Sequence, residues 1–196
     1  MSALRRQSFP FLGNRDYLHG TTLFRALTAL VPQSAHVSFK FIQRIDSDTV
    51  QITTDSDAAT ADARLSWRDG KCAGLLSVSA LPQSKSPIRL AFDEEIVLAA
   101  AHFSDCATTL AEPSPFDYVA TVVPLFKGLL LRVAPQQEKG QWFFARLDSV
   151  ANPRWPAKVS VSLERIVDGR WAKAGIETNA GDFAELYFSW VCRDGA

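Results

Sequence analysis

The chain has 196 residues, 47% of them hydrophobic, and its 21 basic residues balance its 21 acidic ones. This composition excludes intrinsic disorder, and the zero net charge argues against a nucleic-acid binder, which needs a concentrated positive field. No apolar stretch reaches the roughly 18 residues of a membrane helix, and no apolar run follows Arg5 and Arg6 as in a signal peptide, so we expect a cytoplasmic protein without membrane contact.

The first half of the chain predicts one helix followed by four strands. Apolar residues recur at helical spacing from Leu23 to Val31, and the helix is expected to begin near Thr22, a good N-cap residue. Strand-like runs follow at residues 37–45, 50–54, 61–67 and 73–81. Asp69-Gly70 lies between the last two runs and predicts a hairpin turn.

The second half predicts the same order of elements. A longer apolar stripe runs from Val119 to Val133. Because proline is tolerated in the first turn of a helix but is costly further in, this helix is predicted to begin at Pro124. Strand-like runs follow at residues 141–150, 158–166, 171–178 and 183–192, with Asp168-Gly169 as the matching turn. Each half is therefore predicted to contain an entry strand, one buried helix and four antiparallel strands.

Short sequence matches recur in the same order at an offset near one hundred residues. The matching segments are Asp16-Tyr17 with Asp117-Tyr118, Leu23-Phe24-Arg25 with Leu125-Phe126-Lys127, Phe39-Lys40-Phe41 with Trp142-Phe143-Phe144, and Asp69-Gly70-Lys71 with Asp168-Gly169-Arg170. Their shared order predicts a duplication into two fused domains, residues 1–84 and 85–196. A fused pair supplies its own dimer interface, so both a monomer and a homodimer stay open.

Cysteines and histidines are too sparse to predict a metal site or a disulfide framework. Cys72, Cys106 and Cys192 are widely separated, and we expect buried, reduced thiols. The three histidines are dispersed as well. The sequence therefore predicts neither a metal nor a cofactor.

The element order, together with the segment from Asp16 to Gly20 just before the first helix, resembles the hotdog fold. That segment reads Asp-Tyr-Leu-His-Gly. Hotdog thioesterases and dehydratases place a His-Gly, an Asp or an Asn in this loop, and the fused pair resembles a double hotdog such as the dehydratase domains of polyketide synthases. The resemblance implies an α+β fold of two tandem hotdog repeats, each with a long buried helix wrapped by a curved antiparallel sheet.

The chemistry of these families gives His19 and its neighbours a possible role. A thioester reacts through a carbonyl that must be polarised, and backbone N–H groups at a helix start point outward with partial positive charge. The amides of Gly20, Thr21 or Thr22 are candidates to hold the thioester oxygen. His19 is the candidate proton-transfer group, and Asp16 and Tyr17 complete the motif. The alternative is that His19 is a partly buried polar residue of a turn.

The second half departs from this motif, because Ala120-Thr121 replaces the His-Gly pair. The resemblance to dehydratase domains, in which His and Asp come from different hotdogs, implies one shared site to which the second half contributes Asp117 or Tyr118. The alternative is structural, since aspartate before a helix favours the macrodipole and tyrosine packs well. The single-domain dehydratase arrangement, with a glutamate in the helix, is excluded because no acidic residue occurs between Tyr17 and Ile45.

The resemblance thus implies a protein that handles acyl thioesters carried by CoA or acyl carrier protein, with one site at the interface of the two repeats. Hydrolysis by a thioesterase and dehydration of a 3-hydroxyacyl chain both stay open. The alternative is a non-catalytic double hotdog that binds an acyl chain or a protein partner. A third possibility is a structural α+β or barrel-like protein without such a site.

Overall fold

The computed structural model describes residues 5–54, 60–134, 140–155 and 158–191. The chain divides into two compact units, Met1–Asp93 and Glu94–Ala196. The assignment of residues 1–84 and 85–196 to two hotdog repeats stays a prediction. No helix in the described part of the chain is both long and apolar enough to cross a membrane.

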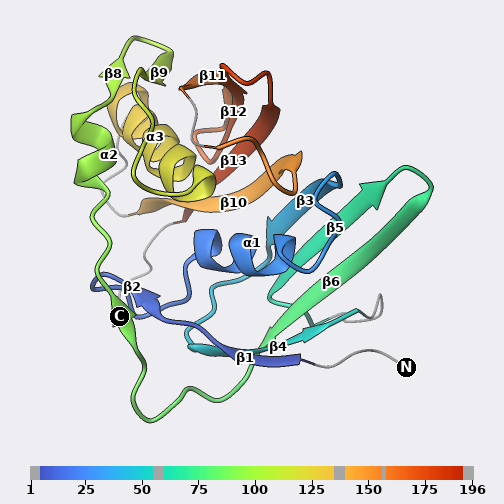
Figure 1. The fold of residues 1–196 in the computed structure, drawn as a ribbon. Helices are drawn as coiled ribbons and strands as arrows, with labels where there is room; N and C mark the ends of the chain where they lie inside the picture. Colours follow the sequence, from blue (N-terminus) through green and yellow to red (C-terminus); the bar gives the residue numbers. More distant parts are fainter. Residues whose placement is uncertain (1–4, 55–59, 135–139, 156–157, 192–196) are drawn as a thin grey trace. The chain divides into compact units, whose positions relative to one another are not determined.

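The first unit is a five-stranded antiparallel sheet with one main helix (Figure 1). Its elements are β1 (Arg5–Ser8), β2 (Phe11–Leu12), α1 (Gly20–Thr28), β3 (His36–Phe41), β4 (Thr49–Thr53), β5 (Ala63–Asp69), β6 (Cys72–Ala80) and β7 (Arg89–Leu90). The sheet order is β1-β4-β6-β5-β3, and β2 and β7 form a separate short parallel pair. The predicted helix and four following strands of this half are confirmed, whereas β2 and β7 were not foreseen.

The core of the first unit forms where the apolar stripe of α1 meets the inward side of the sheet. Leu23 and Leu27 of the helix are fully buried, and so is Phe39 of β3. The ring of Phe24 meets that of Phe39 edge-on at 5.9 Å. Alternate strand residues point to one face, so the same strand that buries Phe39 exposes His36 and gives the sheet an outer side.

The helix of this unit begins slightly earlier than the sequence predicts. His19, not Thr22, is the N-cap residue, with an extended backbone at φ −77° and ψ 139°. The predicted strand 37–45 also ends early, at Phe41, because the amides of Ile42 and Gln43 both turn to the carbonyl oxygen of Asp62.

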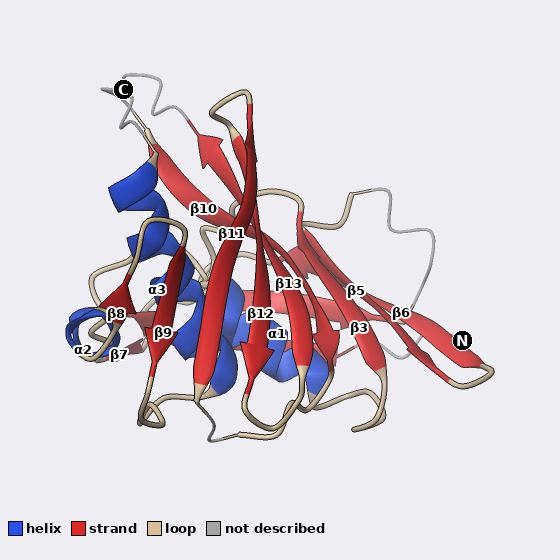
Figure 2. Ribbon diagram, turned by 90° about the horizontal axis from the view of Figure 1, so that it is seen from above, coloured by secondary structure: helices blue, strands red, loops and turns tan. Residues whose placement is uncertain are grey.

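The second unit is a six-stranded antiparallel sheet packed on a longer helix (Figure 1). Its elements are α2 (Glu95–Ala99), β8 (His102–Phe103), β9 (Ala107–Leu110), α3 (Tyr118–Val133), β10 (Gln141–Val150), β11 (Val159–Val167), β12 (Trp171–Thr178) and β13 (Phe183–Val191). Figure 2 shows β9, β11, β12 and β13 side by side. The full order of the strands in this unit is β8-β9-β11-β12-β13-β10. The four strands after the helix are again confirmed.

The prediction that the second helix begins at Pro124 is wrong. The helix begins at Tyr118, and Pro124 lies inside it. An internal proline removes one helical hydrogen bond and costs about 3 kcal/mol or more. Asp117 offsets part of this cost by capping the helix start, and the buried face of the helix supplies the rest, since the ring of Phe126 packs edge-on against Phe188 at 5.3 Å.

Both predicted hairpin turns are present. Asp69 pairs with Cys72 across a two-residue turn in which Gly70 has φ +58°. In the second unit Val167 pairs with Trp171, and Gly169 has φ +63°. Such left-handed backbone angles are the reason for the glycine in each Asp-Gly pair.

The two sheets differ in the order of their strands. In the first unit the strand after the helix, β3, lies beside β5, the third of the four. In the second unit the equivalent strand, β10, lies beside β13, the fourth. The third and fourth strands are neighbours in both units, but the other pairings differ. The duplication inferred from the sequence matches therefore stays a prediction.

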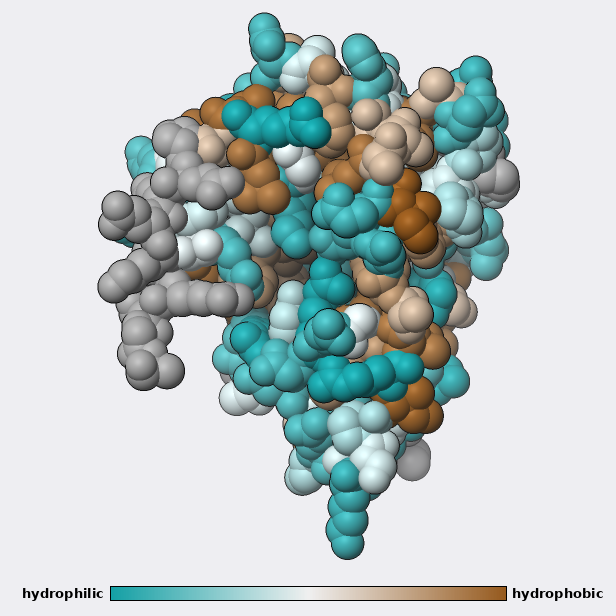
Figure 3. Space-filling view, turned by 90° about the vertical axis from the view of Figure 1, so that its left-hand side faces the viewer, coloured by the Kyte–Doolittle hydropathy of each residue, from teal (hydrophilic) through white to brown (hydrophobic). Residues whose placement is uncertain are grey.

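The surface carries both hydrophobic and hydrophilic side chains. On the face drawn in Figure 3, hydrophobic side chains lie in separate patches between hydrophilic ones.

Cys72 and Cys106 are unpaired but exposed, so the prediction of buried thiols is wrong for both. Cys72 begins a strand after the hairpin turn and Cys106 lies in the turn before β9, and such turns face solvent. Cys192 lies outside the described residues.

Candidate active site

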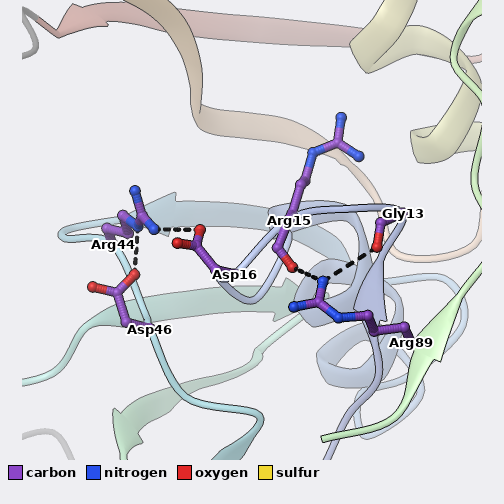
Figure 4. A network of polar contacts seen from close by, with 6 residues as sticks. All are labelled: Gly13, Arg15, Asp16, Arg44, Asp46 and Arg89. Carbon is purple, nitrogen blue, oxygen red and sulfur yellow. Dashed lines mark hydrogen bonds and ion pairs between the residues drawn. The ribbon is translucent and has the colours of Figure 1, made fainter.

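The loop that leads into α1 is anchored at several backbone positions. The amide of Gly13, where φ is +59°, donates to the carbonyl oxygen of Leu90 at 2.8 Å. The guanidinium of Arg89 donates to the carbonyl oxygens of Gly13 and Arg15 at 3.3 and 2.5 Å (Figure 4). Leu18 is fully buried. The loop is therefore held from both the surface and the core, which positions the residue that follows, His19.

Asp16 lies on the outer side of this loop, and the half-buried Tyr17 follows it. Arg44 forms an ion pair with Asp16 at 2.6 Å and a second one with Asp46 (Figure 4). The guanidinium of Arg44 also stacks over the ring of Tyr17, 4.7 Å from its centre. The carboxylate of Asp16 is held at the surface, with 77% of its side chain exposed.

His19 lies on the inner side of the same loop and is only 8% exposed. Its Nδ1 is 2.8 Å from the hydroxyl oxygen of Thr21. The rings of Tyr17 and Phe92 each lie 6.3 Å from the imidazole, centre to centre. The structure therefore brings the predicted residues Tyr17, His19 and Thr21 together around a buried imidazole.

The backbone amides at the start of α1 divide into two groups. The amide of Thr22 donates to the carbonyl oxygen of His19 at 3.1 Å. The amides of Gly20 and Thr21, both buried residues, make no hydrogen bond within the described part of the chain. His19 occupies the N-cap position, yet its side chain caps none of these amides. Two N–H donors at the positive end of the helix are thus left to meet an acceptor beside a buried imidazole.

The start of α3 in the second unit is built differently. Asp117 is its N-cap, and one carboxylate oxygen accepts the amide of Ala120 at 2.8 Å. The hydroxyl of Thr121 donates to the carbonyl oxygen of Asp117 at 2.9 Å. In the repeat alignment Ala120 corresponds to His19, but here it lies inside the first helical turn. The second unit therefore has a capped helix start where the first has an uncapped one.

Tyr118, the other candidate of this half, is a packed residue. It is almost fully buried, and its ring meets that of Trp155 edge-on at 5.7 Å. Burial, with a smaller contribution from the charge of Asp182, raises the pKa of its hydroxyl well above the usual value. Tyr118 therefore stays protonated at neutral pH.

Sequence reasoning missed two neighbours of the candidate site and the side-chain contact of one predicted residue. Thr21 was considered only for its amide, although its hydroxyl contacts Nδ1 of His19. Phe92 and Arg44 are remote from His19 and Asp16 along the chain, so no local pattern points to them. Among the described residues, no group of three or more His, Cys, Asp and Glu side chains is arranged to hold a metal ion.

Comparison with known proteins identifies the fold. No protein-family model matches the chain, and a search of curated protein sequences found no significant match. Solved structures do match over nearly the whole chain. The pyran synthase domain from module nine of the sorangicin pathway is 12% identical, with a TM-score of 0.51, covering 98% of this chain and 94% of that one.

Two further structures give the same result. The bifunctional dehydratase-cyclase domain of ambruticin biosynthesis is 14% identical, with a TM-score of 0.51 and coverage of 97% and 91%. A protein from Thermobifida fusca YX assigned as a thioesterase II is 10% identical, with a TM-score of 0.50 and coverage of 96% and 92%. At such identities the likeness concerns the fold alone. The chain has the hotdog fold predicted from its sequence, shared with polyketide dehydratase domains and thioesterases.

Proposed function

We propose that the chain binds an acyl thioester and acts on it at the loop of residues 16–22. One observation carries this proposal. His19 occupies the N-cap of α1 without capping it, and so leaves the amides of Gly20 and Thr21 without an acceptor in the described part of the chain. Uncapped buried amides are costly, and such local violations of folding rules are typical of functional sites.

The arrangement suits the chemistry of a thioester. The carbonyl oxygen gains negative charge as the group reacts, and the amides of Gly20 and Thr21 would stabilise that charge. His19 would move a proton at neutral pH. The amide of Thr22 donates to the carbonyl oxygen of His19, so the clamp is proposed with two amides. Several proteins with the same fold are named as dehydratases or thioesterases, which supports an acyl thioester as the substrate class. CoA or acyl carrier protein is the proposed carrier of the acyl chain.

The second half of the chain is proposed to contribute two residues to the same site. Asp117 is proposed as the partner that assists His19, with Tyr118 as a substrate contact, in one site shared by two hotdog repeats. A double-mutant cycle between His19→Gln and Asp117→Asn tests this. Coupled residues lose no more activity together than one does alone, whereas independent effects multiply.

The role of His19 is tested with purified protein on a panel of acyl-CoA substrates. His19→Gln should lower turnover by about a hundredfold or more, the usual effect of losing a general acid or base. His36→Gln is the matched control, because His36 is an exposed histidine of the same unit and should keep full activity. Equal turnover in wild type and His19→Gln would remove His19 from the mechanism.

A binding protein without catalysis is the second candidate function. It is favoured by the second unit, where Asp117 caps α3 and Tyr118 packs against Trp155, so both candidate residues already have structural roles. Native mass spectrometry of the purified protein distinguishes the two functions. A retained acyl ligand together with no turnover of any thioester would support binding alone, whereas turnover that depends on His19 would exclude it.

A further inference from the structure

The side chain of Thr21 has an unusual hydrogen bond for a helical threonine. Helical threonines often donate to a carbonyl of the preceding turn. Thr28 does so, with its hydroxyl 3.0 Å from the carbonyl oxygen of Phe24, and Thr121 does so in the second unit. The hydroxyl of Thr21, a residue that is 4% exposed, instead lies 2.8 Å from Nδ1 of His19.

Counting donors and acceptors decides the direction of this bond. A hydroxyl has one hydrogen to donate and two lone pairs. If Nδ1 of neutral His19 carried the proton, the hydroxyl would accept it, and the hydroxyl hydrogen would need another acceptor. The described part of the chain offers the Thr21 hydroxyl no other hydrogen bond, and a buried donor without an acceptor is costly.

We infer that Thr21 donates its hydroxyl hydrogen to Nδ1, so that neutral His19 carries its proton on Nε2. Thr21 is then a positioning residue in two senses. It fixes the plane of the imidazole against the first turn of α1, and it selects one of the two tautomers. The same hydroxyl can rotate and accept from Nδ1 once the ring is protonated, so the contact persists in both charge states.

The consequence for chemistry rests on the proposed function. With the proton on Nε2, resting His19 is a hydrogen-bond donor at that atom, as the amides of Gly20 and Thr21 are at theirs. A site with these three donors recognises an acceptor-rich group such as a thioester carbonyl. In its resting form the imidazole would polarise that group before it served as a base, because Nδ1, its unprotonated nitrogen, is bonded to Thr21.

The inference is tested by nitrogen-15 NMR of the histidine rings in the intact protein, at a pH where His19 is neutral. The chain has three histidines, so the His19→Gln variant assigns the His19 signals. Wild type should show the Nε2–H tautomer. Thr21→Val should lower the ratio of the Nε2–H to the Nδ1–H tautomer about fivefold, which corresponds to about 1 kcal/mol for one hydrogen bond. Thr21→Ser should restore the wild-type ratio.

Thr28→Val is the matched control, since it removes a buried hydroxyl from the same helix without touching His19, and the tautomer ratio should not change. An Nδ1–H tautomer in wild type, or an unchanged ratio in a folded Thr21→Val variant, would overturn the inference. The NMR result needs no substrate. A wild type with the expected tautomer but no thioester turnover or binding would therefore refute the proposed function alone.

Discussion

Variants of Asp117 can separate its structural role, capping α3, from the catalytic role proposed for it. Its carboxylate accepts the amide of Ala120 at 2.8 Å at the start of α3. Asp117→Ala removes this cap and leaves the Ala120 amide, in a residue that is 8% exposed, without an acceptor. Asp117→Asn keeps an acceptor oxygen in place and removes only the charge. The two variants therefore differ mainly in the capping hydrogen bond.

The expected magnitudes follow from these contacts. Loss of an N-cap costs about 1 kcal/mol, and loss of a negative charge at a helix start adds about 0.5 kcal/mol. Asp117→Ala should thus lower the free energy of unfolding by about 1.5 kcal/mol, and Asp117→Asn by about 0.5 kcal/mol. For a chain of this length, 1.5 kcal/mol corresponds to a fall in Tm of about 3–6 °C.

Thermal and denaturant unfolding, followed by circular dichroism, measure these changes. Asp16→Ala is the control, because its surface ion pair with Arg44 should contribute little to stability. Equal losses of stability in Asp117→Ala and Asp117→Asn would refute the capping argument. If Asp117 also assists His19, Asp117→Asn will lower turnover although it keeps most of the stability.

Two further predictions concern the first unit. Burial acts to raise the pKa of Asp48, but hydrogen bonds from the hydroxyl and amide of Ser84 outweigh it and lower that pKa below its usual value. The carboxylate therefore stabilises the fold above about pH 4 and loses this effect as the pH falls through its native pKa. Denaturant unfolding should show Asp48→Asn less stable than wild type at pH 7, with a gap that narrows below pH 4; a constant gap would contradict this. Gly74→Ala places a methyl group 2.5 Å from Nε1 of Trp67, so a loss of about 1–3 kcal/mol is expected. The smaller ring of Trp67→Phe should recover part of that loss in the double variant, and no recovery would argue against the clash.

Local sequence patterns predicted those helices, strands and turns that depend mainly on neighbouring residues. The strands of both halves follow apolar runs that one face of a sheet can bury. The turns at Gly70 and Gly169 follow from a left-handed backbone that glycine adopts without strain. The loop before α1 was also identified locally, since the segment from Asp16 to Gly20 that resembles the hotdog loop spans only a few residues.

The start of α3 shows where local reasoning fails. Pro124 is a strong signal for a first helical turn, yet the helix begins at Tyr118. The cap from Asp117 and the packing of Phe126 against Phe188 together outweigh the preference of one proline. Packing against a strand far along the chain leaves no mark in the residues around Pro124.

The sequence alone therefore determined the hotdog-type order of helix and strands, and it singled out His19 and the amides beside it. The tertiary structure decided what those groups are bonded to. It paired Arg44 with Asp16 and placed Phe92 beside His19. It also paired β3 with β5 in the first unit, whereas the equivalent strand of the second unit, β10, pairs with β13. These pairings join residues distant in sequence, and they depend on which surfaces remain to be buried once the elements have formed. That is why a short segment resembling the hotdog loop identified the candidate histidine, whereas only the folded chain showed that its side chain does not cap the helix.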